Sequence, residues 1–162
     1  MPAHSQSRVV PYTADLMYAV VADVEKYPEF LPWVVGLRVF ARHPAAASDG
    51  LESGAAGRRE ILEAEMLVGF GALRERYTSR VTLGAHKVDV TQIEGVFRHL
   101  ETHWRFTPEG PENKSCRVDF SIAFEFKSRL LNAVAGKAFE HVLLQMTDAF
   151  EARAKALSHK TA

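Results

Sequence analysis

Residues 116–126 read Cys-Arg-Val-Asp-Phe-Ser-Ile-Ala-Phe-Glu-Phe, the most regular stretch of the chain. Every second position carries a thiol, aliphatic or aromatic side chain, and the positions between them carry charged or small ones. Because successive side chains of a β-strand point to opposite faces, this alternation predicts a long strand with one wet face and one dry, aromatic face. A dry face of this length needs a second apolar surface to cover it.

Weaker alternation predicts more strands of the same kind on the N-terminal side. These strands are expected at residues 34–41, 57–68, 77–83, 88–94 and 100–106. Residues 84–86 and 108–114 are predicted as connections, and the second of these is rich in Pro, Gly and Asn, as hairpin loops usually are.

Two segments change to the helical period. Thr13 is expected to cap a short helix that must end before Pro28. From Ser128, a second predicted N-cap, apolar side chains recur at i, i+3 and i+4 spacing as far as about Leu157, which predicts one long amphipathic helix. Its apolar stripe consists of Leu131, Ala135, Phe139, Val142, Leu143, Met146, Ala149 and Phe150.

The dry sheet face and the dry helix stripe are complementary. We therefore expect an α+β fold in which a curved antiparallel sheet of about seven strands wraps around the C-terminal helix, with short helices after the first strand. A chain of 162 residues fits a single domain, 1–162, with a core from about residue 5 to 157. A sheet curled around a helix also tends to leave a tapered space between them.

The balance of charges and the N-terminal sequence argue against several classes of protein. Twenty Lys and Arg residues balance twenty Asp and Glu residues, so the chain lacks the positive field of a nucleic-acid binder and no DNA partner is expected. The first ten residues lack the apolar core of a signal peptide, and no stretch approaches ~18 consecutive apolar residues. A cytoplasmic location is expected.

Signatures of catalysis or metal binding are absent from the sequence. His99 and His103 share the polar face of a predicted strand with Glu101 and Arg105, and we interpret them as solvated surface histidines rather than metal ligands. Cys116 is the only cysteine and falls on the dry phase of its strand, where a thiol is inert. We expect no catalytic residue, no metal and no required cofactor.

The inward-facing large side chains either fill a core or line a pocket of about 300–1,000 Å³ for a hydrophobic ligand. Tyr77 and Gln92 are the candidates for contacts with a polar head group, and Trp33 either closes one end of the pocket or packs in the core. Phe30 and Leu31, near the mouth, are expected to contact a bilayer. The predicted ligand contacts are Trp33, Leu62, Met66, Phe70, Tyr77, Gln92, Phe97, Trp104, Phe106, Phe120, Phe124, Phe139, Leu143 and Met146.

Several strings, taken in order, resemble the coenzyme Q-binding, polyketide-cyclase-like branch of START-like domains, which includes proteins described as ribosome-association toxins. They are YPEFLPW at 27–33, GVFRHL at 95–100, WRF at 104–106, the strand at 116–126 and MTDAFEARA at 146–154. The strings span most of the chain. Val34 and Val96 depart from the branch, which often has Cys and Pro there, but both remain apolar.

This resemblance implies a helix-grip (START-like, Bet v-like) fold that holds an isoprenoid quinone such as ubiquinone, or a similar lipid. We therefore expect a non-catalytic carrier that supports respiratory electron transport, cytoplasmic or peripheral at the inner membrane. One alternative is a toxin-like protein that binds a ribosomal subunit and interferes with subunit association. A lesser alternative is a polyketide cyclase or aromatase, which would need titratable groups that point inward.

Overall fold

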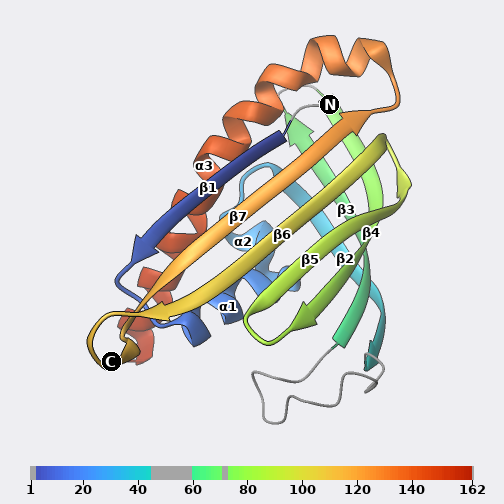
Figure 1. The fold of residues 1–162 in the computed structure, drawn as a ribbon. Coiled ribbons are helices and arrows are strands. Elements are labelled where there is room, and N and C mark those ends of the chain that lie inside the picture. Colours follow the sequence, from blue (N-terminus) through green and yellow to red (C-terminus); the bar gives the residue numbers. More distant parts are fainter. Residues whose placement is uncertain (1–2, 45–59, 71–72, 162) are drawn as a thin grey trace.

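The computed structural model describes residues 3–44, 60–70 and 73–161, with side chains described except at 44, 70, 73, 134–140, 144 and 159–161 (Figure 1). In chain order the elements are β1 (Ala3–Val10), α1 (Ala14–Ala22), η1 (Val24–Lys26), α2 (Tyr27–Phe30), β2 (Val34–Pro44), β3 (Glu60–Phe70), β4 (Leu73–Gly84), β5 (Lys87–Gly95), β6 (Phe97–Glu109), η3 (Pro111–Asn113), β7 (Ser115–Phe126) and α3 (Arg129–Thr161).

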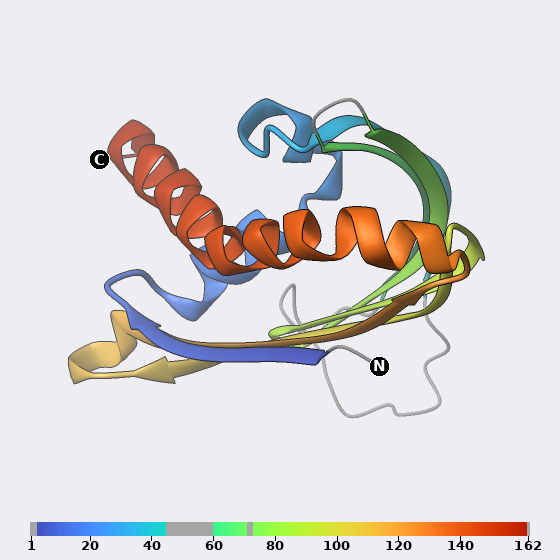
Figure 2. The ribbon, with the colours of Figure 1, turned by 90° about the horizontal axis from the view of Figure 1, so that it is seen from above.

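The strands form one antiparallel sheet in the order β1-β7-β6-β5-β4-β3-β2. The sheet curves, and α3 lies along its concave side (Figure 2). The expected architecture is confirmed, and several strands are longer than their alternation predicted: β6 extends from Phe97 to Glu109. Residues 57–59 of one predicted strand lie outside the described residues.

The alternation of β7 has the predicted consequence for burial. Phe120 and Phe124 are each 2% exposed and Ile122 between them is 6% exposed, whereas Ser121 and Ala123 are partly exposed. From the other side, Leu143 and Phe150 of α3 are each 1% exposed and close the concave face. Each side chain of this size contributes roughly 1.5–3 kcal/mol when it leaves water, so this shared core dominates the stability of the fold.

Both predicted helix caps are present. The Thr13 hydroxyl accepts a hydrogen bond from the backbone N–H of Leu16 at 3.1 Å, and Ser128 Oγ accepts one from Leu131 at 3.2 Å. Helix α1 ends before Pro28 as predicted, and Pro28 then lies in the first turn of α2, where its missing N–H costs no hydrogen bond. Helix α3 continues one turn past the predicted end, to Thr161.

Polar contacts hold α3 against the edge strand β1. Thr147 is 1% exposed and its hydroxyl donates to Gln6 Oε1 at 2.8 Å. Arg8 lies 2.6 Å from Asp148 and 3.1 Å from Glu151, measured from Nη1 to the carboxylate oxygens. These contacts set how far along the sheet the helix lies.

Gly95 ends β5 with φ +144°, a conformation that side chains disfavour, and a Cβ there would meet Cβ of Tyr77 at 2.5 Å and its Cα at 2.8 Å. Gly95→Ala is expected to lower the free energy of unfolding by about 1–3 kcal/mol. Gly84→Ala is the matched control, since a Cβ there meets nothing within 4 Å. Urea unfolding of both variants measures the difference, and equal values would contradict this account of Gly95.

Candidate functional site

A cavity of about 100 Å³ lies between the concave sheet face and α3. Its wall combines residues from η1 and α2, from every strand except β1, and from α3. The lining is mainly aliphatic and aromatic, and among the described residues it includes no Lys, Arg, His, Asp or Glu. The cavity is smaller than the predicted 300–1,000 Å³, because the large inward side chains fill much of the space that they enclose.

The predicted ligand contacts divide into two groups. Those at the cavity wall are Trp33, Met66, Tyr77, Trp104, Phe120 and Met146. Those buried in the core but not at the wall are Leu62, Phe97, Phe106, Phe124 and Leu143. The side chains of Phe70 and Phe139 lie outside the described residues. The inward face of the sheet extends beyond the cavity, so an inward position alone does not place a residue at the wall.

Gln92 has a structural role instead of the predicted role in head-group recognition. Its amide nitrogen donates to the carbonyl of Phe97 at 2.6 Å, and its amide oxygen accepts from the N–H of Phe97 at 2.9 Å. This pair of bonds bridges the turn at Gly95 between β5 and β6. The backbone of Phe97 thus holds the amide of Gln92, and Gln92 is not among the residues at the cavity wall.

Two polar wall residues were not among the predicted ligand contacts. Ser79 on β4 is 3% exposed and Thr102 on β6 is 8% exposed, and both line the cavity. Their positions in the sequence could have identified them, since each lies at an inward-facing position of a strand, between large apolar residues. A hydroxyl in such a position is a polar group in an apolar interior.

The cavity wall also contains two tyrosines in different situations. The Tyr27 hydroxyl donates to the backbone carbonyl of Val21, and burial raises the pKa of Tyr27 well above its ordinary value. The Tyr77 hydroxyl donates to Met66 Sδ at 3.2 Å, and burial raises the pKa of Tyr77 to about 12. A thioether is a weak acceptor, so Tyr77 is a neutral donor without a strong partner.

The segment expected to contact a membrane forms part of the wall. Leu31 is 2% exposed and lines the cavity, so it does not reach a bilayer in this conformation, contrary to the prediction. Phe30 packs against the Phe150 ring at 5.4 Å. The Arg153 guanidinium lies over the Phe30 ring at 5.2 Å and contacts Glu29 at 3.3 Å. We call the contact made by Glu29, Phe30, Phe150 and Arg153 the α2–α3 contact.

Cys116 is 0% exposed on β7, and burial raises the pKa of its thiol to about 11. The thiol therefore stays protonated at neutral pH and is a poor nucleophile. Within the part of the chain that the structure describes, no group of three His, Cys, Asp or Glu side chains could hold a metal ion. In the same residues, no helix is both long and apolar enough to span a bilayer.

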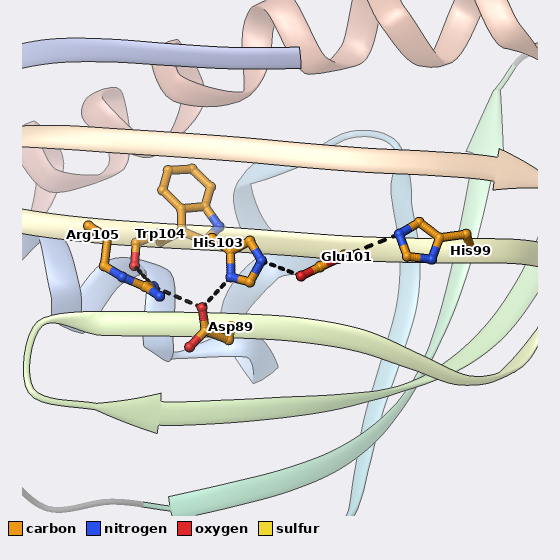
Figure 3. Close-up of polar contacts among 6 residues, drawn as sticks. All are labelled: Asp89, His99, Glu101, His103, Trp104 and Arg105. Carbon is orange, nitrogen blue, oxygen red and sulfur yellow. Dashed lines mark hydrogen bonds and ion pairs between the residues drawn. The ribbon is translucent and has the colours of Figure 1, made fainter. Parts of the chain in front are cut away.

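The outer sheet face carries an ionic cluster formed by Asp89 on β5 and by His99, Glu101, His103 and Arg105 on β6 (Figure 3). The two ring nitrogens of His103 lie 2.6 Å from Asp89 and 2.7 Å from Glu101. Arg105 also contacts Asp89, at 2.8 Å, and His99 contacts Glu101 at 3.5 Å. His103 is therefore not the freely solvated histidine that we predicted, although its side chain remains 38% exposed.

The contacts in this cluster shift two pKa values. The hydrogen bond to Asp89, followed by the one to Glu101, raises the pKa of His103 against the opposing effect of burial. Burial alone would raise the pKa of Asp89, but the hydrogen bonds from His103 and Arg105 together lower it. Protonated His103 donates from both ring nitrogens, so the cluster is best satisfied when the imidazolium is present.

The sequence profile of the family described as polyketide cyclase/dehydrase and lipid transport matches residues 10–151. The chain belongs to this family. The mitochondrial coenzyme Q-binding protein COQ10 homolog B of Xenopus laevis is 34% identical to this member over 154 residues, which cover 93% of the chain and 57% of the relative. The chain thus spans little more than half of that relative.

Other relatives match this family member over nearly their full length. Ribosome association toxin RatA of Escherichia coli K12 is 31% identical over 96% of the chain and 88% of the toxin. The solution structure of the 18 kDa protein CC1736 from Caulobacter crescentus is 36% identical, with a TM-score of 0.73, and covers 98% of this chain and 99% of that one.

His103→Gln is expected to reduce the free energy of unfolding more at about pH 6 than at about pH 9. The folded pKa of His103 is raised above 6.5, so its contribution is complete below that value and is lost as the pH rises through the folded pKa. Urea unfolding at both pH values measures the effect. His99→Gln is the control on the same strand face, and a difference between His103→Gln and the wild type that does not change with pH would contradict the assignment.

Proposed function

We propose that the protein is a non-catalytic carrier of a hydrophobic small molecule, and that the molecule is an isoprenoid quinone such as ubiquinone. The observation that carries this proposal is the uncharged, largely apolar cavity enclosed between the sheet and α3. Membership of a family that includes lipid transport supports the hydrophobic ligand, and the similarity to coenzyme Q-binding proteins supports the quinone.

Binding of this kind needs apolar area rather than reactive groups. Removing roughly 200 Å² of ligand surface from water contributes about 5 kcal/mol at 25 cal/mol per Å². At about 100 Å³ the cavity is smaller than an engineered cavity of about 150 Å³ that binds benzene in another protein, so a ring enters only when side chains of the wall move apart. The isoprenoid tail would then extend out of the cavity. The α2–α3 contact lies at one boundary of the cavity, where the tail could pass.

The charged side chains favour a carrier over a cyclase. The ionic groups of β6 lie on the outer face of the sheet, away from the cavity. The tyrosines that line the cavity have pKa values raised by burial, so neither loses its proton near neutral pH. Neither side chain is suited to act as a general base for a cyclase reaction in this cavity.

A second candidate function is binding to a ribosomal subunit. The observation in its favour is the match to the ribosome association toxins, which covers 88% of the Escherichia coli protein, compared with 57% of the coenzyme Q-binding relative. A location in the cytoplasm suits this function, and a peripheral position at the inner membrane suits a quinone carrier. Both locations belong to the proposal.

A cavity-filling variant tests the carrier function. Ala64 is 2% exposed at the cavity wall, so Ala64→Leu places an isobutyl group in the space meant for the ligand. This variant is expected to lose at least tenfold in affinity for a short-tailed benzoquinone in equilibrium dialysis. Ala123→Leu makes the same change on the outer face of β7 and should bind as the wild type does. Equal binding by all three proteins would refute the cavity as the site.

Lipid extraction and native mass spectrometry of the purified protein separate the two functions. A quinone that co-purifies with the wild type and is absent from Ala64→Leu supports the carrier. Co-sedimentation with ribosomal subunits at moderate salt, unchanged in Ala64→Leu, supports the subunit binder, because that function does not need the cavity. Failure to pellet with either subunit removes the second candidate.

A further inference from the structure

Four side chains that can donate hydrogen bonds interrupt the apolar wall of the cavity. They are Tyr77 and Ser79 on β4, and Thr102 and Trp104 on β6. Ser79 and Trp104 are each 3% exposed and Thr102 is 8% exposed, while Tyr77 is partly buried with its hydroxyl withdrawn from water. We call them the donor set.

The donor set has few partners in the protein. The Tyr77 hydroxyl reaches the weak acceptor Met66 Sδ, at 3.2 Å. The side chains of Ser79, Thr102 and Trp104 line the cavity and make no hydrogen bond to any residue that the structure describes. Most buried polar groups in proteins are paired, and each unpaired one costs about 1–3 kcal/mol. Three donors at one cavity therefore lack a partner among the described residues and the fourth has a weak one, so an occupant with hydrogen-bond acceptors would satisfy them.

Neighbouring polar side chains show that this fold does pair its polar groups elsewhere. Tyr27 lines the same cavity, and its hydroxyl donates to the carbonyl of Val21. Gln92 satisfies both ends of its amide on the backbone of Phe97. Outside the donor set, the described residues include one buried side-chain polar atom without a partner, His4 Nε2, which does not line this cavity.

The charge of the wall restricts what the occupant can be. No cationic side chain lines the cavity among the described residues, so a carboxylate or phosphate placed there would be buried without a counter-charge. Trp104 can only donate, and Tyr77 stays protonated because burial raises its pKa to about 12. Neutral oxygen acceptors such as carbonyl or ether groups fit this set, whereas acid head groups do not.

The strand register separates the donor set into two pairs. Tyr77 and Ser79 are neighbours on one face of β4, and Thr102 and Trp104 are neighbours on one face of β6, with β5 between them. Asp89 pairs with Thr82 on one side and with His103 on the other, so the β6 pair is displaced along the sheet by about four residues from the β4 pair. With strands about 4.8 Å apart and a rise of about 3.4 Å per residue, the two pairs are roughly 16 Å apart along the backbone.

We propose that the cavity binds the ring of its ligand rather than the tail, and that the donor set recognises neutral oxygen acceptors on that ring. This inference rests on the proposed carrier function and adds to it the chemical class of the buried group. It also assigns Tyr77 and Trp104 as specificity-determining residues. A fatty acid or a phospholipid head group is excluded from this position by the same chemistry.

Equilibrium dialysis of the full chain against two ligands tests this proposal. One ligand is a dimethoxy-benzoquinone with a decyl tail, and the other is decylbenzene, which has a ring and tail of the same kind without oxygens. The wild type should prefer the quinone by at least tenfold. Tyr77→Phe and Trp104→Phe should each lower quinone affinity about tenfold, the loss of roughly one buried hydrogen bond, and leave decylbenzene unchanged.

Two control variants separate effects on ligand recognition from effects on folding. Tyr18→Phe removes a hydroxyl from a tyrosine that packs on Phe106 outside the cavity wall, and it should bind both ligands as the wild type does. Thr102→Val has nearly the same shape as the wild-type residue. In the absence of ligand, Thr102→Val and Tyr77→Phe should keep or raise the melting temperature, because each removes a poorly paired polar group.

The outcomes distinguish this inference from the function on which it rests. Equal affinity of the wild type for both ligands, or quinone affinity unchanged in Tyr77→Phe and Trp104→Phe, overturns the donor set while the carrier function stands. Binding of neither ligand by the wild type overturns the carrier function and the inference with it. A lower melting temperature for Thr102→Val without ligand also counts against the donor set, because it shows that the hydroxyl is satisfied within the protein.

Discussion

The rest of the structure depends on the mutual burial of one aromatic sheet face and one helix stripe. Helix α1 packs against β5, β6 and β7, and α3 lies along the concave side of the sheet and buries its own apolar stripe there (Figure 2). A twisted sheet curves and a helix is a rod, and the two shapes do not match everywhere. The cavity is what remains of that mismatch after the large side chains have filled most of it.

The position of α3 also separates two chemical environments. Its contacts with β1, through Thr147 and Arg8, hold the helix where its apolar stripe covers the concave face. The ionic residues of the outer face then pair with each other in water, as His103 does with Asp89. Among the described residues, the cavity wall contains hydroxyls and an indole but no charged side chain, so a ligand there would be selected by hydrogen bonding and shape.

The fold was predictable from the sequence because its signals are periodic and local. Eleven alternating residues from Cys116 to Phe126 identify a strand wherever it lies, and the hydroxyls of Thr13 and Ser128 mark helix starts through bonds to residues three positions away. The site was less predictable because alternation reports which face a side chain occupies and not how deep it lies. Phe97 and Trp104 are both inward, but only Trp104 reaches the cavity.

The remaining errors come from contacts that no local pattern encodes. The bonds of Gln92 to Phe97 exist because a glycine turns the chain between them, and the alternation of β5 carries no trace of that turn. Leu31 is buried because α2 folds back toward α3, over a hundred residues later in the chain. The volume of the cavity depends on the packing of all these residues together, so it could only be measured in the structure.

The α2–α3 contact has a consequence for the rate at which a ligand could enter or leave the cavity. A molecule longer than the cavity can enter or leave through this boundary only while the Phe30 ring is separated from Phe150 and from the guanidinium of Arg153. Each opening leaves these two rings in water for its duration. Exchange of the proposed ligand through this boundary would then proceed at the frequency of opening and not at the rate of collision, which would give it a long residence time even at modest affinity.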